Sequence, residues 1–158
     1  MTLFAIVGFG WITVFAMQEY VDSVEVECLA KNLYFEARNE STAGQIAVLQ
    51  TTINRVGSPL FPDTVCGVVY EGMHVRGHPV RDGCQFSWYC DGISDYPTNR
   101  VAYSKSVELS QWILLTNRWL PDLTDGSIYY HADWMENYPI WSRTKVKTVQ
   151  IDQHIFYR

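Results

Sequence analysis

The sequence predicts a single α+β domain that is mostly helical and carries a small antiparallel sheet near its C-terminus. Its 158 residues are the length of one domain, and 47% of them are hydrophobic, which is enough for a core. Apolar residues recur at helical spacing between residues 24 and 56, whereas residues after Gly126 alternate between polar and apolar. No internal repeat divides the chain further.

The first 20 residues are predicted to be an export signal or a signal anchor, ahead of a domain spanning 24–158. No charged side chain occurs before Glu19, and the apolar run 3–17 is about 15 residues long, close to the apolar region of a signal peptide and shorter than a transmembrane span. No Lys or Arg precedes the run. Cleavage, retention as an anchor and transient membrane association through residues 3–17 all stay open, and the alternative is a buried core helix in a cytosolic protein.

A first helix is expected from Val24 to Glu40. Its apolar stripe consists of Val26, Leu29, Ala30, Leu33 and Ala37. At about 100° per residue, Glu36 falls on one edge of this stripe and Glu40 falls within it, near the helix end. Both carboxylates should therefore face the body of the protein or a cleft in it. Arg38 points to a different face, where an ion pair with another part of the chain is expected.

A second helix is expected after the sequence NESTAGQ, because Thr42 and Gln45 have the spacing of a capping box. Its predicted buried face consists of Ile46, Leu49, Ile53 and Val56. Gly57 is placed to take the left-handed conformation that ends a helix, and Pro59 blocks continuation.

The remaining regular elements are a third helix and two strands. The helix is expected from about Thr98 to Trp119, between Pro97 and Pro121. The alternating segments 127–132 and 144–151 predict strands. These strands form the small sheet of the predicted fold.

Residues 57–96 are expected to be a long irregular region, and long ordered loops in compact domains are usually functional. The region contains Cys66, Cys84 and Cys90, and Cys28 lies in the first helix. Four cysteines allow three pairings in an exported protein, and a bridge between Cys84 and Cys90 is the first choice.

A zinc site built from His74, His78 and Cys84 is the competing interpretation of the same region. Gly77 and Pro79 break any helix that would place both histidines on one face, and the spacing fits no familiar zinc pattern. We therefore expect no metal and no cofactor.

Charge and composition narrow the class of partner. The formal net charge is -5, so the chain has no basic field to hold a phosphate backbone, and nucleic acid is an unfavourable partner. Aromatic residues make up 15% of the chain, with 6 Trp and 10 Tyr. Such side chains combine flat apolar faces with a polar edge, which suits carbohydrate as well as protein cores.

The two glutamates favour glycoside chemistry. A carboxyl held against apolar side chains ionises less readily, so its pKa rises and it can donate a proton near neutral pH. Glu36 and Glu40 on one helix face would have Cβ atoms only ~5–6 Å apart, too close to flank a sugar ring. A single acid that later acts as a base fits better. In peptidoglycan the sugar's own 6-hydroxyl can then be the nucleophile, which makes a lytic transglycosylase.

Five segments resemble, in order, the cell wall hydrolase family typified by the SleB and CwlJ spore cortex-lytic enzymes. They are LAKNLYFEARNESTAGQIAVLQTTINRV, FPDTVCGVVY, CQFSWYCDG, YYHAD and HIFYR, and the resemblance runs from about residue 27 to the C-terminus. It implies a lysozyme-like fold and cleavage of the glycan strand of peptidoglycan. A domain without a separate wall-binding module resembles a phage endolysin or a small envelope hydrolase.

The resemblance also implies site residues. The family's catalytic glutamate, in the motif Tyr-x-Glu-(Ala/Ser)-Arg-Gly-Glu, falls on Glu36, and the second glutamate of the motif falls on Glu40. Asn39 stands where the family usually has glycine, and Asn is the best substitute for glycine in a left-handed conformation. The alternative for Glu40 is a structural hydrogen bond to neighbouring backbone at the helix end.

Six further residues are predicted to line the cleft. Gln85 and Ser87 could bond sugar or acetamido groups while Phe86 or Trp88 stacks on a ring, although alternate residues of an extended segment point opposite ways, and both aromatics could instead be core. Tyr130 and His131 are candidates to orient the glycan or to stabilise the oxocarbenium-like transition state. His131 could equally be a satisfied structural histidine.

The sequence therefore predicts an exported lytic transglycosylase that acts on peptidoglycan glycan strands, with Glu36 first as acid and then as base. A muramidase that admits water in place of the 6-hydroxyl is the alternative within enzymes. A non-catalytic glycan-binding module and a membrane-anchored structural or virion protein are the alternatives from other classes.

Overall fold

The computed structural model of the chain describes residues 21–158. The helices are α2 (Ser23–Ala37), α3 (Thr42–Val56), α4 (Val65–Val69) and α5 (Arg100–Thr116), with short 3-10 helices η1 (Ser87–Cys90), η2 (Asn117–Trp119) and η3 (Ile140–Arg143). The strands are β1 (Gly72–Val75), β2 (His78–Cys84), β3 (Tyr129–Ala132), β4 (Lys147–Ile151) and β5 (His154–Tyr157). The predicted export segment 1–20, with its membrane-associating residues 3–17, lies outside the described residues. Within residues 21–158, no helix is both long enough and apolar enough to span a bilayer.

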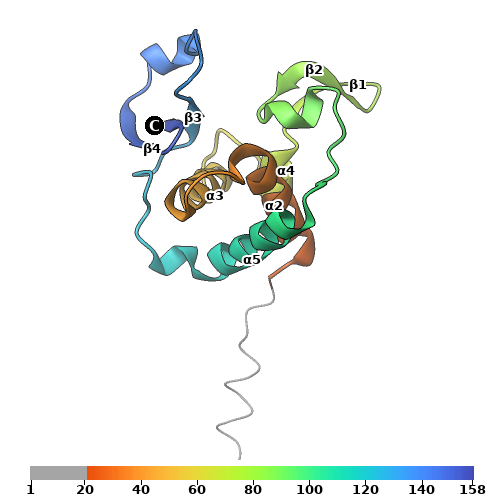
Figure 1. Cartoon of the computed structure of the whole chain (residues 1–158). Coiled ribbons are helices and arrows are strands. Elements are labelled where there is room, and N and C mark those ends of the chain that lie inside the picture. Colours follow the sequence, from red (N-terminus) through yellow and green to blue (C-terminus); the bar gives the residue numbers. More distant parts are fainter. Residues whose placement is uncertain (1–20) are drawn as a thin grey trace, which may run out of the picture.

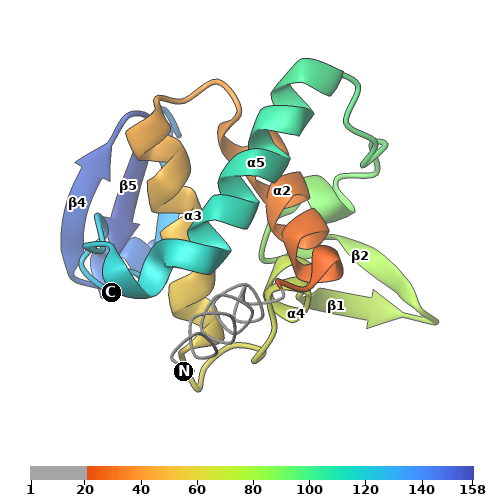
Figure 2. The same ribbon diagram turned by 90° about the horizontal axis from the view of Figure 1, so that it is seen from below.

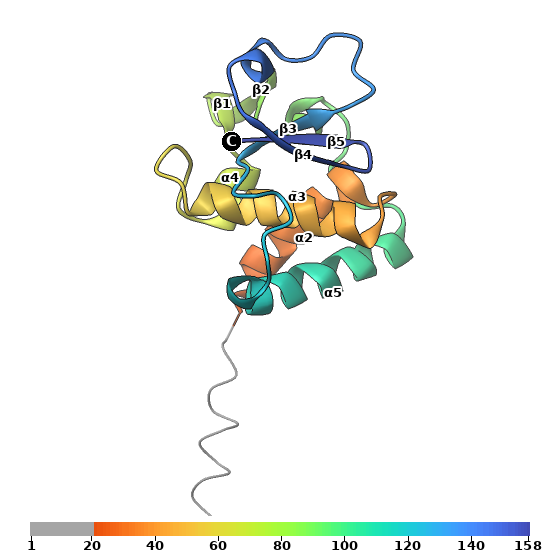
Figure 3. The same ribbon diagram turned by 90° about the vertical axis from the view of Figure 1, so that its left-hand side faces the viewer.

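The helices form the base of the molecule, and two β elements rise from it. In Figure 1 the C-terminal strands lie at the upper left and the β1–β2 hairpin at the upper right, both above α2, α3 and α5. Seen from below in Figure 2, α3 runs beside β4 and β5 while α2 lies toward the hairpin. Figure 3 shows the order from bottom to top as α5, then α2 and α3, then the sheet. The predicted α+β class, mostly helical with a small antiparallel sheet near the C-terminus, is confirmed.

Helix α2 begins where the sequence predicts but ends three residues early, at Ala37 rather than Glu40. Asp22 caps its start by accepting a hydrogen bond from the Val24 amide at 2.8 Å. After Ala37 the chain turns, and the Glu40 amide donates to the Ala37 carbonyl at 3.0 Å. Glu40 therefore lies in a turn, and the prediction that both glutamates rise from one helix face is wrong.

The N-cap of α3 is Ser41, so the predicted capping box of Thr42 and Gln45 is wrong. The Ser41 hydroxyl accepts from the Gly44 amide at 3.2 Å. The Gln45 amide group instead donates to the Glu40 carbonyl at 3.3 Å. The helix ends at Val56 as expected, but Gly57 keeps a right-handed conformation (φ -78°), so the left-handed cap is also wrong.

The buried face of α3 is wider and more polar than its apolar spacing predicts. Leu49 is fully buried, but Ile46, Ile53 and Val56 are only half-buried. The remaining buried side chains of the helix include Gln50, Thr51, Thr52 and Arg55. These polar groups are tolerated because they find partners; the Gln50 side chain, for example, donates to the Pro121 carbonyl and accepts from the Leu123 amide.

Helix α5 closely follows the prediction between Pro97 and Pro121. Its N-cap is Asn99, whose side chain accepts from the Ala102 amide at 3.0 Å. The last turn tightens into η2, so that helical structure ends at Trp119.

The region 57–96 is not irregular, because it contains α4, a β-hairpin and η1. Val75 pairs with His78 across a two-residue loop in which Arg76 and Gly77 both have positive φ, 52° and 82°. Two positive φ angles are what a tight hairpin turn requires. Gly77 thus makes a turn within a hairpin.

The two disulfides join Cys28 to Cys66 and Cys84 to Cys90. The first ties α2 to α4, and the second ties the end of β2 to η1. The predicted Cys84–Cys90 bridge is confirmed. It also removes the Cys84 sulfur from the set of residues considered for zinc.

The C-terminal sheet has the strand order β3-β5-β4, with both pairs antiparallel. The segments predicted as strands correspond to β3 and β4. The central strand β5 was missed, although all four of its residues are buried. A strand of four residues that follows a turn is too short for alternation to be recognised.

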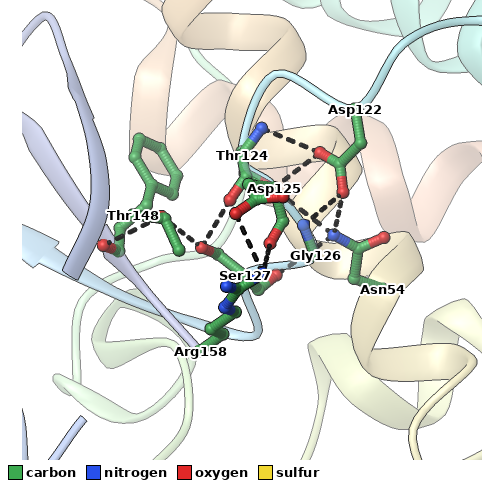
Figure 4. A network of polar contacts seen from close by, with 9 residues as sticks. Asn54, Asp122, Thr124, Asp125, Gly126, Ser127, Thr148 and Arg158 are labelled. Carbon is green, nitrogen blue, oxygen red and sulfur yellow. Dashed lines mark hydrogen bonds and ion pairs between the residues drawn. The ribbon is translucent and has the colours of Figure 1, made fainter. Parts of the chain in front are cut away.

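A polar network fixes the connection between α5 and β3 (Figure 4). The Asp122 carboxylate accepts hydrogen bonds of 2.7–2.8 Å from the Thr124 amide and hydroxyl, the Gly126 amide and the Asn54 side chain. Ser127 continues the network to Thr148 on β4 at 2.7 Å. The loop that leads into β3 is thereby attached to α3 and to the sheet.

Replacing both Cys28 and Cys66 by Ala should lower the free energy of unfolding by about 2–4 kcal/mol, because their bridge joins residues 38 apart in the chain. Replacing Cys84 and Cys90, which are 6 apart, should cost about 2 kcal/mol or less. Urea denaturation of the two double variants beside wild type measures both losses. Equal losses, or a larger loss for the short loop, would contradict this interpretation.

Asp122→Ala should lower the free energy of unfolding at pH 7 by about 1–2 kcal/mol, a value reduced for solvent screening because Asp122 is exposed. Burial raises the pKa of Asp122, but the hydrogen bonds from Thr124, Asn54 and Gly126 outweigh it and lower that pKa overall. The stabilisation is thus present above the unfolded pKa and is lost as pH falls through the folded pKa.

The penalty of Asp122→Ala should accordingly shrink below about pH 4, near the ordinary aspartate pKa. Thermal unfolding across pH measures it. Asp125→Asn, in the same loop but with an exposed ion pair to Arg158, is the control and should cost under about 1 kcal/mol. A penalty of Asp122→Ala that is constant with pH would exclude the charge as its cause.

Candidate active site

A cleft of about 820 Å³ separates the hairpin side of the molecule from the C-terminal sheet. Its volume lies within the range typical of ligand sites. It brings together all the sequence-predicted site residues: Glu36, Glu40, Gln85, Phe86, Ser87, Trp88, Tyr130 and His131. One wall comes from the segment 84–91, and the other from β3 and the chain that follows it.

Glu36 lies in the last turn of α2 and reaches the cleft floor. Its Oε2 atom accepts a hydrogen bond from the Tyr130 hydroxyl at 3.0 Å. Burial raises the pKa of Glu36, while the Tyr130 hydrogen bond and the charge of Arg55 act in the opposite direction without cancelling that rise. The carboxyl therefore keeps its proton to a higher pH than an ordinary glutamate, which is the property that a general acid needs.

Tyr130 extends from β3 toward Glu36. Burial, followed by the nearby charge of Glu36, raises its pKa well above that of an ordinary tyrosine. Its ring packs edge-on against His154, with centroids 5.1 Å apart. Tyr130 is consequently a neutral hydrogen-bond donor whose position is fixed by its neighbours.

Arg55 is a component of the site that sequence reasoning missed. It is only 4% exposed, and its Nε donates to the Ile128 carbonyl at 2.8 Å. The guanidinium lies 5.0 Å from the centroid of Phe86 and 5.7 Å from that of Tyr130. Burial lowers its pKa, yet a guanidinium stays protonated in proteins. Arg55 therefore places a positive charge beside Glu36.

No sequence signal distinguished Arg55, because a basic residue in the last turn of a helix is the ordinary complement of the helix dipole. Its Nη1 atom is buried and has no hydrogen-bond partner within residues 21–158. The contribution of Arg55 to the cleft is therefore mainly its positive charge rather than hydrogen bonds.

Glu40 is held by the turn between β4 and β5. Its Oε2 accepts from the Gln153 amide at 3.3 Å, and its Oε1 lies 3.9 Å from His154 Nδ1. The structural alternative expected Glu40 to bond to backbone next to the end of α2. The backbone group that it bonds to, the Gln153 amide, is instead distant in the sequence. Burial raises the pKa of Glu40, and the adjacent Asp152 raises it further.

His154 also lines the cleft and was not singled out from the sequence. Burial lowers its pKa, so it is neutral near pH 7, and its ring separates Tyr130 from Glu40. Its role depends on contacts between distant segments, which no local pattern reveals.

Exposure alternates along QFSW, although Ser87 and Trp88 begin the 3-10 helix η1 and the segment is not extended throughout. Gln85 and Ser87 are exposed, whereas Phe86 and Trp88 are 2% and 7% exposed. The Trp88 indole donates to the Asn32 side chain at 3.1 Å and stacks on Phe35 with centroids 4.8 Å apart. The two aromatics support the wall from within, and the two polar residues face outward at the cleft.

His131 has partners on both ring nitrogens. Nδ1 lies 2.9 Å from the Ala132 carbonyl, so it carries the proton, and Nε2 then accepts from the Tyr157 hydroxyl at 3.0 Å. The ring is also 4.3 Å from that of Tyr138. These contacts indicate that His131 has a structural role and holds neighbouring side chains in place, and they argue against direct contact with the reacting sugar.

Among residues 21–158, Arg38 has no partner for the ion pair expected from the sequence. Its Nη1 donates to the Tyr34 carbonyl at 3.1 Å, and its guanidinium lies 4.7 Å from the centroid of the Tyr34 ring. The prediction that it points away from the face of Glu36 agrees with its absence from the cleft lining.

Within residues 21–158, no group of three or more His, Cys, Asp or Glu side chains is arranged to hold a metal ion.

Comparison with known proteins identifies relatives across most of the chain. The cell wall hydrolase family matches residues 39–157. The spore cortex-lytic enzyme of Bacillus subtilis is 30% identical over 132 residues, which cover 84% of this chain and 37% of that enzyme. The chain spans 34–41% of the length of the curated relatives that it matches first.

Two solved structures share the fold. The catalytic domain of the germination-specific lytic transglycosylase SleB from Bacillus anthracis has a TM-score of 0.62 and 29% identity, with 89% of this chain and 98% of that chain covered. The catalytic domain of the Bacillus cereus SleB protein has a TM-score of 0.61 and 27% identity, with 89% and 94% covered. By the family match over residues 39–157, this chain belongs to the cell wall hydrolase family.

Proposed function

We propose that the protein cleaves the glycan strand of peptidoglycan as a lytic transglycosylase, with Glu36 as the single acid and base. The observation that carries the proposal is a half-buried carboxyl in the lining of a cleft, whose pKa is raised, which accepts a hydrogen bond from Tyr130 and interacts with the charge of Arg55. The names of the relatives, which include a lytic transglycosylase and several spore cortex-lytic enzymes, support it. The family match begins at residue 39 and does not reach Glu36, so the assignment of this residue rests on the geometry of the cleft and on the motif YFEARNE.

The proposed reaction needs one carboxyl group in two protonation states. Glu36 first gives its proton to the glycosidic oxygen, and the bond from that oxygen to the sugar's C1 breaks. The sugar is then an oxocarbenium-like species, and Glu36 is ionised. The carboxylate next takes the proton of the 6-hydroxyl, whose oxygen bonds to C1 and closes the 1,6-anhydro ring.

Tyr130 and Arg55 stabilise the ionised form of Glu36 that follows the first proton transfer. The Tyr130 hydroxyl donates to Glu36, and a hydrogen bond to the charged form of a carboxyl stabilises it. Arg55 adds a fixed positive charge. Both groups therefore make it easier for Glu36 to lose its proton than burial alone would allow.

The other carboxyl groups of the cleft are engaged, which favours the transglycosylase over a two-carboxylate hydrolase. Glu40 accepts from the Gln153 amide, and burial, with Asp152 beside it, raises its pKa. Asp91 accepts from the Ile93 amide at 2.7 Å. A hydrolase with a second carboxylate needs that group free to activate water or to attack the sugar.

We also propose that the protein acts outside the cytoplasm, in the cell envelope. Two disulfides support an oxidising location. Residues 1–20 would then serve as the export signal or as an anchor, and residues 24–158 as the catalytic domain. Expression of a reporter fused to residues 1–20 would test export, and retention of the reporter inside the cell would contradict it.

Purified peptidoglycan digested by the full chain should yield 1,6-anhydro ends, and Glu36→Gln should slow their release by about 10²–10⁴-fold, the usual contribution of an acid–base group. Mass spectrometry of the products measures both. Glu108→Gln, an exposed change of the same kind on α5, is the control and should behave as wild type. Reducing ends in place of anhydro ends would instead establish a muramidase.

Two further outcomes of that digestion would contradict the assignment. Full activity in Glu36→Gln would show that another group is the acid. Binding of glycan without any product from wild type would favour the non-catalytic module.

The raised pKa of Glu36 predicts that Glu36→Gln stabilises the fold at pH 7 but not at pH 4. The folded state holds the proton of Glu36 more tightly than the unfolded state, so wild type loses stability as pH rises from the unfolded pKa through the folded one. A neutral glutamine avoids this loss, and each pKa unit corresponds to about 1.4 kcal/mol.

Urea denaturation at the two pH values measures the effect, with Glu108→Gln as the control. A gain in stability that is the same at both pH values would show that packing, and not ionisation, is responsible.

A further inference from the structure

The segment 133–146, between β3 and β4, forms the outer part of one cleft wall and exposes large apolar side chains. Trp134 is 72% exposed, and Tyr138 and Ile140 are exposed as well. Trp134 and Met135 line the same cleft as Glu36. An exposed indole that belongs to a cleft is a feature of ligand-binding surfaces.

The residue before Trp134 is fixed at three points. The Asp133 amide donates to the Gln153 carbonyl at 2.8 Å, and its carboxylate accepts from the Gln150 side chain at 2.9 Å. The Tyr138 hydroxyl donates to the Asp133 carbonyl at 3.1 Å. The indole of Trp134 thus projects from a backbone that is anchored to the sheet.

Trp134 differs in its contacts from the other aromatic residues of the cleft. Trp141, on the same segment, packs against Tyr129 and Tyr157, with ring centroids 5.5 Å away in each case. Trp134 makes no ring contact and no hydrogen bond with any other residue in the described range 21–158. Its flat face is therefore available to a ligand.

The position of Trp134 separates it from the reacting bond. Tyr130, which contacts Glu36, lies within β3 (Tyr129–Ala132), and Trp134 follows beyond the end of this extended strand, up to about 14 Å along the chain. Between them β3 leads toward the end of the cleft that Gln153 and His154 line. A strand bound across Glu36 can therefore reach Trp134 with a sugar some way from the cleaved bond.

The chemistry of the surroundings matches a glycan. A pyranose ring presents C–H groups on its faces and hydroxyls around its edge, and an indole face offers apolar area at low entropic cost. Gln153 provides polar atoms at the same end of the cleft. A protein partner would have to enter this cleft beside Glu36, whereas a glycan strand is already its proposed occupant.

We propose that the indole of Trp134 is a stacking platform for a sugar ring of the glycan strand, distant from the cleaved bond, and that it makes the protein favour long strands over short ones. This inference rests on the proposed function, because it assumes that the strand lies across Glu36. It assigns a binding role to a residue outside the five segments that carry the family resemblance.

The test measures binding separately from cleavage, in full-length Glu36→Gln protein. Calorimetry with peptide-free glycan strands compares an octasaccharide with a disaccharide. Adding Trp134→Ala should weaken octasaccharide binding about 10-fold and leave disaccharide binding unchanged. Trp134→Phe should keep most of the affinity, since a smaller flat ring remains.

Trp119→Ala is the matched control, because its indole is 66% exposed but lies outside the cleft lining. It should bind both strands as the parent does. In the active enzyme, Trp134→Ala should lower kcat/KM about 10-fold on long strands only.

Unchanged octasaccharide binding by Trp134→Ala would overturn the inference, as would an equal loss for both strands. A loss seen only with peptide-bearing strands would assign the surface to the stem peptide instead, and would also overturn it. If wild type cleaves no strand but binding still depends on Trp134 and on length, the proposed function fails and the platform stands. If wild type cleaves normally and Trp134 has no effect, only the platform fails.

Discussion

Docking of the β4–β5 turn onto the turn between α2 and α3 sets the geometry of the cleft. Asp152, at φ 48°, accepts from the Ser41 amide at 2.8 Å, and Glu40 accepts from the Gln153 amide at 3.3 Å. A side chain at Gly44 would collide with the Asp152 carboxylate, so this close approach requires glycine. β5 begins directly after the turn and carries β3 beside it, which brings Tyr130 to Glu36.

The same docking explains why the two glutamates of the motif differ in character. Glu40 accepts a hydrogen bond from the Gln153 backbone and has acidic neighbours, whereas Glu36 accepts from the Tyr130 hydroxyl and interacts with the positive charge of Arg55. Arg55 lies between Glu36 and Glu71, whose Oε2 atom has no hydrogen-bond partner within residues 21–158. Burial raises the pKa of Glu71, and Arg55 opposes this rise. One buried cation thus moderates the desolvation of two carboxyls, and a buried charge persists only where such opposite charges compensate it.

The sequence predicts the helical elements well because their signals are local. Prolines and apolar stripes placed α2, α3 and α5 within a few residues even though both predicted caps of α3 were wrong, and Glu36 was identifiable as a carboxyl on the edge of such a stripe. What escaped prediction depends on distant segments. β5 is central only because β3 and β4 pair with it, and Arg55 acquires its role from rings that come from Phe86 and Tyr130. The hairpin was missed although Arg76 and Gly77 carried a turn signal, since the glycine was interpreted only as a helix breaker.

The cleft is preformed, since each wall is held by its own set of constraints. The Cys84–Cys90 bridge closes the wall of 84–91 on itself, and the hydrogen bond from Trp88 to Asn32 attaches that wall to α2. The network around Asp122 fixes the start of β3 to α3. Neither set involves the opposite wall, so the width of the cleft follows from the packing of α2 against α3. A rigid cleft loses little conformational entropy when it binds a strand. Most of the favourable free energy of binding can therefore serve to orient the glycosidic bond of that strand at Glu36.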